Sequence, residues 1–134
     1  MKFDFSAQFL RVNPPDTSFG DSWESLCFAL LDAEFDDPSL IRLRPPDKGV
    51  DILHRNEQKA FQCKSNEQGA FGSMSANESI KSLNTAFSQK KLLSWETYAF
   101  AANANYTGSA FTSIIGLFNA YVRYLRVVMP RYVL

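Results

Sequence analysis

Two strand-like runs lie on either side of a short polar break in the middle of the chain. Residues 50–54 read Val-Asp-Ile-Leu-His, residues 60–65 read Ala-Phe-Gln-Cys-Lys-Ser, and a turn is expected around Asn56-Glu57. This pattern predicts an antiparallel hairpin. A hairpin cannot bury both of its faces by itself, so other elements must cover it. These two strands therefore constrain the fold more than any other feature of the sequence.

The flanking segments supply the covering elements. Three amphipathic segments predict helices that start at polar capping residues. They begin at Asp21 with Glu24, at Ser75 with Glu78, and at Ser109, the last ending at Pro130. Further strands are expected over residues 40–44 and 95–102. The predicted order is α-β-β-β-α-β-α, an α/β class with a central mixed sheet between layers of helices.

Length and charge limit the possible functions. The 134 residues fit one domain, expected over residues 21–134 after an irregular segment 1–20. The formal net charge is zero, which excludes a global basic field for nucleic acid. Any nucleic-acid contact must come from a local patch, and a solvated surface explains the same residues equally well. The candidates are Arg42, Arg44 and Lys48 near the hairpin, and Lys90 and Lys91 after the second helix.

Cysteine and histidine are too few for a zinc site. Cys27 and Cys63 are the only cysteines, and we expect both to be reduced core residues. The single His54 adds little as a ligand. No signal peptide is recognisable, and no stretch reaches the roughly 18 apolar residues of a membrane span. A cytoplasmic location without membrane contact is the default expectation.

The hairpin brings polar side chains together. If Asn56-Glu57 forms the turn, residues whose numbers sum to 113 pair, so Asp51 lies opposite Gln62. Lys64 shares the face of Gln62, while His54 takes the face opposite Asp51. A carboxylate and a neighbouring oxygen suit a hard cation, and an ammonium can stabilise charge on a phosphodiester. Taken singly, each residue also has a structural explanation, such as capping a strand or bonding across the sheet.

These residues carry a resemblance to a known family. Gly49-Val50-Asp51 followed by Gln62-Cys63-Lys64 resembles the PD-(D/E)xK nuclease superfamily, and most of all its Mrr-type restriction endonuclease branch, where glutamine replaces the acid. Members carry a glutamate early in the first helix, matched here by Glu24. The resemblance covers roughly residues 20–122, including a turn that reads ANYTGSA. Asp47 supplies a literal Pro-Asp, but the separation of Asp51 from Gln62 fits one hairpin.

The resemblance implies a restriction-endonuclease-like three-layer fold and a Mg²⁺-dependent endonuclease whose expected substrate is double-stranded DNA. Mn²⁺ is expected to substitute for Mg²⁺. Asp51, Gln62 and the backbone carbonyl of Cys63 would hold the metal. Lys64 would position the attacking water or stabilise the transition state, and Glu24 would support the metal or a water. Family members commonly serve as effector modules in bacterial defence.

Two other functions stay open. Neutral Gln62 and zero net charge are compatible with a catalytically inactive binding or assembly module, and an RNA-directed nuclease is the other alternative. The apolar segment 123–134 is expected to be a contact surface, so that the chain acts as a homo-oligomer or as a module of a larger assembly. The alternative is that this segment folds into the domain's own core.

Overall fold

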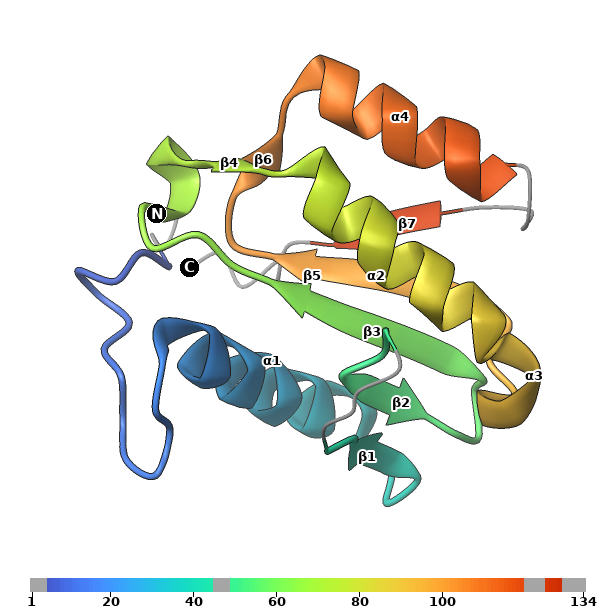
Figure 1. Cartoon of the computed structure of the whole chain (residues 1–134). Coiled ribbons are helices and arrows are strands. Elements are labelled where there is room, and N and C mark those ends of the chain that lie inside the picture. Colours follow the sequence, from blue (N-terminus) through green and yellow to red (C-terminus); the bar gives the residue numbers. More distant parts are fainter. Residues whose placement is uncertain (1–4, 45–48, 120–124, 129–134) are drawn as a thin grey trace.

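The computed structural model describes residues 5–44, 49–119 and 125–128, and Figure 1 shows their arrangement. The elements in chain order are α1 (Phe19–Phe35), β1 (Leu40–Arg42), β2 (Ile52–His54), β3 (Lys59–Lys64), the 3₁₀ helix η1 (Gly69–Phe71), β4 (Ser73–Met74), α2 (Ala76–Ser88), α3 (Lys90–Leu93), β5 (Thr97–Ala102), β6 (Asn105–Tyr106), α4 (Gly108–Asn119) and β7 (Leu125–Val128).

A five-stranded mixed sheet forms the centre, in the order β1-β2-β3-β5-β7. β1, β2 and β3 pair in antiparallel fashion, while β5 pairs parallel to β3 and to β7. β4 and β6 form a separate two-stranded parallel sheet. The predicted α/β class with a mixed sheet is confirmed.

Helices cover both faces of the main sheet, with α1 on one side and α2 and α4 on the other (Figure 1). Trp23 and Cys27 of α1 pack with Phe61 in one buried cluster. Leu83 of α2 and Ile114 of α4 belong to a second cluster on the opposite face. Neighbouring residues of β3 contribute to different clusters because strand side chains alternate between the faces.

The hairpin forms with the register that its turn predicts. Ile52 pairs with Phe61, Leu53 with Ala60 and His54 with Lys59, so the numbers of each pair sum to 113. The turn occupies residues 55–58, centred on Asn56-Glu57 as predicted. β2 begins at Ile52, two residues later than expected, and the neighbouring strand β1 ends at Arg42, two residues earlier than expected.

The predicted cap of the first helix, Asp21, is wrong by three residues. Ser18 is the N-cap, and its hydroxyl accepts a hydrogen bond from the backbone N–H of Asp21 at 3.1 Å. The carboxylate of Asp21 accepts instead from the N–H and the hydroxyl of Thr17. Glu24 therefore lies in the second turn of the helix and takes no part in capping. The predicted cap of α2 is correct, since Ser75 accepts from the N–H of Glu78.

The third predicted helix differs at both ends. Thr107, not Ser109, caps α4 by accepting from the N–H of Ala110 at 3.2 Å. α4 ends at Asn119, and Leu125, which we assigned to the helix, belongs to β7. Part of the predicted contact segment 123–134 thus contributes an edge strand to the domain's own sheet, as the alternative expects. Its remaining residues, 123–124 and 129–134, lie outside the described residues.

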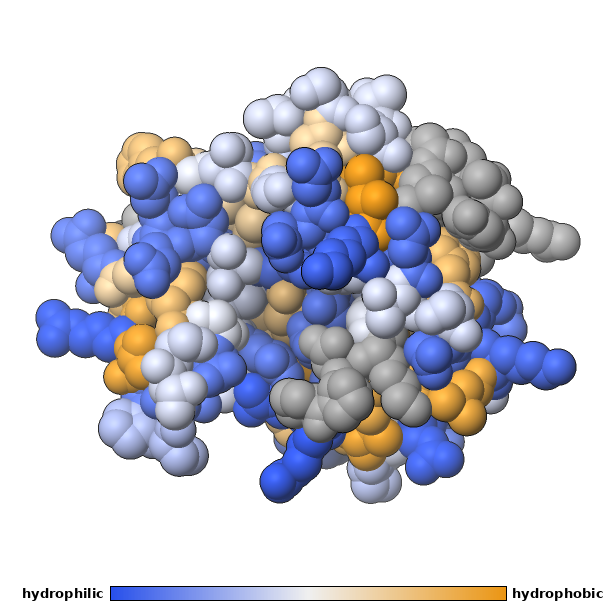
Figure 2. Space-filling view, viewed as in Figure 1, coloured by the Kyte–Doolittle hydropathy of each residue, from blue (hydrophilic) through white to orange (hydrophobic). Residues whose placement is uncertain are grey.

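Helix hydrophobicity and the distribution of apolar residues on one face describe the surface of the molecule. No helix in the described ranges has the length and hydrophobicity needed to cross a membrane. On the face shown in Figure 2, hydrophilic residues cover much of the surface, and the hydrophobic ones form small separate patches. Scattered apolar residues of this kind are normal on a protein surface.

Gly49 allows the segment before β2 to approach α2 closely. Its φ is +75°, in the left-handed region that favours glycine. A Cβ at this position would lie 2.4 Å from the carbonyl oxygen of Ser82 and 2.6 Å from the backbone nitrogen of Ala86. The hydroxyl of Tyr98 donates to the Gly49 carbonyl at 2.7 Å. This contact fixes the position of Asp51, two residues later.

We expect Gly49→Ala to lower the free energy of unfolding by about 2–5 kcal/mol, because a left-handed alanine costs about 1–2 kcal/mol and overpacking about 1–3 kcal/mol. Urea denaturation followed by circular dichroism measures the change. Gly108→Ala is the matched control, since a Cβ there meets nothing within 4 Å. Its stability should stay the same or rise by up to about 1 kcal/mol. Equal effects of the two substitutions would contradict the close approach at Gly49.

Candidate functional site

Asp51 lies at the point where the regular ladder between β2 and β3 ends. Its backbone N–H donates to the carbonyl of Phe61 at 2.9 Å, and its carbonyl accepts from Leu43. One carboxylate oxygen of Asp51 accepts from the backbone N–H of Cys63 at 2.8 Å. The prediction that Asp51 and Gln62 form a regular cross-strand pair is therefore wrong, because the regular pairing ends at Ile52 with Phe61. The side chain of Asp51 instead replaces the missing backbone partner of β3.

Two further oxygens lie at this edge of β3. In a strand, the N–H and C=O of one residue point to the same side, so the Cys63 carbonyl points toward Asp51 as its N–H does. Gln62 is 5% exposed, and its side-chain oxygen Oε1 is buried with no hydrogen-bond partner among the described residues. A buried polar atom without a partner costs free energy and calls for an explanation.

Lys64 shares the face of Gln62, as predicted. Ala60 belongs to the cluster under α2, and alternation places residues 62 and 64 on the same side. The ammonium nitrogen of Lys64 donates to the hydroxyl of Ser82 on α2 at 2.6 Å. The amide of Gln62 and the ammonium of Lys64 thus lie between β3 and α2, next to the strand edge that carries Asp51.

Glu24 comes from α1, which covers the other face of the sheet. Its Oε1 atom lies 2.9 Å from Nε of Arg42 in an ion pair whose side chains are 19% and 36% exposed. Arg42 also donates to the hydroxyl of Ser25 at 3.0 Å. Glu24, a predicted catalytic carboxylate, and Arg42, a predicted phosphate-binding residue, are thus paired with each other.

The side chain of Cys63 packs on the α1 side of β3 in the same cluster as Cys27. Its thiol pKa is raised well above the usual value, first by a hydrogen bond with Cys27 and by burial. The negative charges of Asp51 and Glu24 add smaller contributions in the same direction. Cys27 and Cys63 are free thiols, as predicted.

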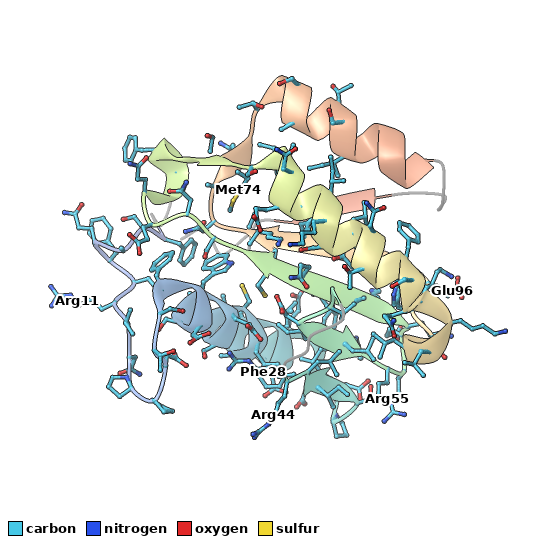
Figure 3. All side chains as sticks on the ribbon, viewed as in Figure 1. Arg11, Phe28, Arg44, Arg55, Met74 and Glu96 are labelled. Carbon is cyan, nitrogen blue, oxygen red and sulfur yellow. The ribbon has the colours of Figure 1, made fainter. Side chains whose placement is uncertain are left out.

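The predicted basic residues come from two regions, β1 with the residues after it and α3. Arg44 is exposed and points outward (Figure 3), whereas Lys48 lies outside the described residues. Lys90 pairs with Glu96 at 3.2 Å, and its ammonium lies 5.4 Å from the centre of the Trp95 ring. Glu96 directly precedes β5, whose first residue, Thr97, pairs with the start of β3. Lys90 therefore lies by the end of β5 that pairs with Lys59, whereas Lys64 pairs with the other end of β5.

Lys91 adjoins Lys90 in α3. Nucleic-acid contact through Arg42, Arg44, Lys90 and Lys91 stays a prediction.

His54 lies in the core on the α1 side of the sheet. It is 2% exposed and its ring centre lies 4.5 Å from that of Phe35. Its Nε2 atom is 2.8 Å from a carboxylate oxygen of Asp37. This hydrogen bond is the main cause that lowers the pKa of Asp37 to about 2. His54 and Asp37 thus form a structural contact on the α1 side of the sheet, whereas Gln62 lies on the α2 side.

The donor atoms at the strand edge fit a hard divalent cation. Asp51 supplies a carboxylate, Cys63 a carbonyl and Gln62 a buried amide oxygen, and Mg²⁺ prefers oxygen ligands and keeps several waters. In the described part of the chain, no three His, Cys, Asp or Glu side chains converge on one point. Any cation here would therefore depend on amide and backbone oxygens beside a single carboxylate, which predicts modest affinity.

Sequence reasoning missed two residues that organise the site. Ser82 contacts Lys64, and its only sequence signal is a polar residue beside the apolar face of α2. Asn103 is 1% exposed, and its amide nitrogen donates to the carbonyls of Phe5 and Asn66 at 2.7 and 2.8 Å. Its Oδ1 atom accepts from the N–H of Asn66. Asn103 therefore joins the N-terminal segment to the chain just beyond Lys64.

A scan against protein-family models gave no match, and searches of curated proteins and of solved structures gave none either.

Proposed function

We propose that this chain is a metal-dependent endonuclease of the PD-(D/E)xK type that hydrolyses phosphodiester bonds in DNA. The observation that carries the proposal is the buried, unpartnered Oε1 of Gln62 beside the strand edge that presents Asp51. A cation is a partner that would satisfy this buried oxygen and could also take the Asp51 carboxylate as a ligand. The restriction-endonuclease-like arrangement, with the Lys64 ammonium two residues further along the strand, belongs to the same proposal.

Each residue has a defined task in this proposal. Asp51, Gln62 and the carbonyl of Cys63 would hold Mg²⁺ or Mn²⁺. When bound, the metal would neutralise negative charge on the phosphodiester. Lys64 directs its ammonium at the attacking water or at the charge that develops on the phosphoryl oxygens, where a preorganised donor stabilises the transition state. The Cys63 N–H keeps the Asp51 carboxylate oriented along the edge of β3.

Glu24 has a supporting task that depends on Arg42. The ion pair at 2.9 Å must loosen before the Glu24 carboxylate can orient a water or a metal. A DNA phosphate is a competing anion for Arg42, because guanidinium groups bind phosphate with two parallel hydrogen bonds. Substrate binding would then release Glu24 while Arg42 contacts the DNA backbone.

A catalytically inactive binding or assembly module is the second candidate. Two observations favour it. Glu24 is held in an ion pair with Arg42, and Asp51 is the single carboxylate that the described residues place at the strand edge. An effector module in bacterial defence is compatible with the nuclease, and a homo-oligomer or larger assembly would provide the two active sites that a double-strand cut requires.

Cleavage of a supercoiled plasmid with Mg²⁺ or Mn²⁺, and with EDTA in parallel, tests the proposal. We expect nicked circles and then linear DNA with either metal, and intact plasmid with EDTA. If two copies act together, linear product should rise more steeply with protein concentration than nicked product does. Equal cutting in EDTA would refute a metal-dependent nuclease, and intact plasmid with both metals would favour the inactive module. Cleavage of structured RNA in preference to plasmid would identify an RNA-directed enzyme.

A further inference from the structure

The ammonium of Lys64 is held by a residue of another element. Its Nζ atom donates to the hydroxyl of Ser82 at 2.6 Å, and Ser82 is half-buried in the middle of α2. A lysine side chain has four rotatable bonds and no fixed geometry of its own, unlike a planar guanidinium. A short hydrogen bond to a hydroxyl on a packed helix therefore restricts where this ammonium can lie.

Ser82 is itself fixed against the segment that carries Asp51. The backbone of Gly49 approaches so closely that a Cβ there would lie 2.4 Å from the Ser82 carbonyl oxygen. The next residue of α2, Leu83, is fully buried, which sets the rotation of the helix about its axis. One residue of α2 thus meets the Gly-Val-Asp segment through its backbone and the Gln-Cys-Lys segment through its side chain.

We propose that Ser82 is a positioning residue for Lys64. Its hydroxyl accepts from the ammonium and holds it on the α2 side of β3, next to Gln62 and the edge that carries Asp51. Ser82 would affect phosphodiester hydrolysis only through Lys64, without contacting substrate or metal. This inference rests on the proposed nuclease function for its effect on the rate, but the contact between Ser82 and Lys64 can be tested without any cleavage.

The kinetic test compares three substitutions in α2. Ser82→Ala is expected to lower kcat about tenfold with KM for DNA unchanged, because small misplacements of a catalytic group reduce the chemical step. Ser82→Thr keeps a hydroxyl and should recover most of the rate. Ser79→Ala is the matched control, since Ser79 lies one turn earlier and its hydroxyl bonds Tyr106 at 2.6 Å. It should leave kcat and KM unchanged.

The second readout is the rate at which Lys64 is acylated, measured by mass spectrometry relative to Lys59 on the same strand. Loss of the hydrogen bond should raise this rate several-fold in Ser82→Ala and leave it unchanged in Ser79→Ala. If Ser82→Ala does not fold, Ser82→Cys replaces the hydroxyl with a weak acceptor and carries the same expectation.

The two readouts separate the two claims. A raised acylation rate in a protein that cuts no DNA would sink the nuclease proposal and leave the positioning of Lys64 by Ser82 intact. Unchanged acylation of Lys64 in folded Ser82→Ala would overturn the inference, whatever the cleavage rate. A fall in kcat that Ser82→Thr does not restore would also count against it.

Discussion

Lys64→Ala should abolish phosphodiester cleavage while leaving the fold intact. Removing one preorganised donor from a transition state typically lowers the rate by about 10²–10³-fold. The backbone of Lys64 pairs with Ala102 of β5, and this pairing does not depend on the side chain. The side chain itself extends to the hydroxyl of Ser82. We therefore expect Lys64→Ala to lose plasmid nicking and to keep a circular dichroism spectrum close to that of the parent protein.

Lys59→Ala is the matched control for this result. Lys59 lies on the same strand at its other end, with its ammonium 5.5 Å from the centre of the Phe35 ring. Lys59→Ala should cut at a rate within about twofold of the parent protein. A surface substitution away from the site usually changes free energies by no more than about 0.5 kcal/mol. Full activity in folded Lys64→Ala would remove Lys64 from the mechanism, and an unfolded Lys64→Ala protein would show a structural role instead.

Asp51→Asn is expected to abolish both metal binding and cleavage. The substitution removes the negative charge but keeps an oxygen that can accept from the N–H of Cys63, so the strand edge should survive. Gln62→Glu changes the neighbouring amide to a carboxylate and should tighten Mg²⁺ binding or at least retain it. Titration calorimetry with Mg²⁺ and Mn²⁺ measures affinity, and plasmid nicking measures activity in the same preparations.

Asp36→Asn controls for the loss of one carboxylate. Asp36 is exposed at the end of α1, with a φ of 47° that asparagine tolerates. It should bind metal and cut DNA as the parent does. If Asp51→Asn cuts as well as the parent, Asp51 is not the ligand, and Asp47, which lies outside the described residues, becomes the candidate.

Local patterns predicted the hairpin well. The position of Asn56-Glu57 determined the register, because a turn of known length leaves one alignment of its strands. The cap of α2 at Ser75 followed from spacing alone. The start of α1 was ambiguous, since Ser18 and Asp21 are both good caps and Glu24 follows Asp21 at the capping spacing. The contact of Ser18 with the Asp21 N–H decides between them.

The polar contacts at the site could not be predicted in the same way. The ion pair of Glu24 with Arg42 and the hydrogen bond of Lys64 with Ser82 each join residues 18 positions apart on different elements. Such contacts depend on the rotation of α1 and α2 about their axes, which buried apolar residues determine. The departure of Asp51 from the ladder also has no local signal, because it depends on where β2 separates from β3.

The presence of a cation between Asp51 and Gln62 is the central claim, and anomalous diffraction from crystals soaked in Mn²⁺ tests it most directly. The account predicts a manganese peak about 2.1 Å from the Asp51 carboxylate, Oε1 of Gln62 and the carbonyl of Cys63, with waters completing an octahedron. The peak should disappear in Asp51→Asn crystals soaked in the same way. A manganese ion bound elsewhere, with Oε1 of Gln62 still unpartnered, would contradict the account.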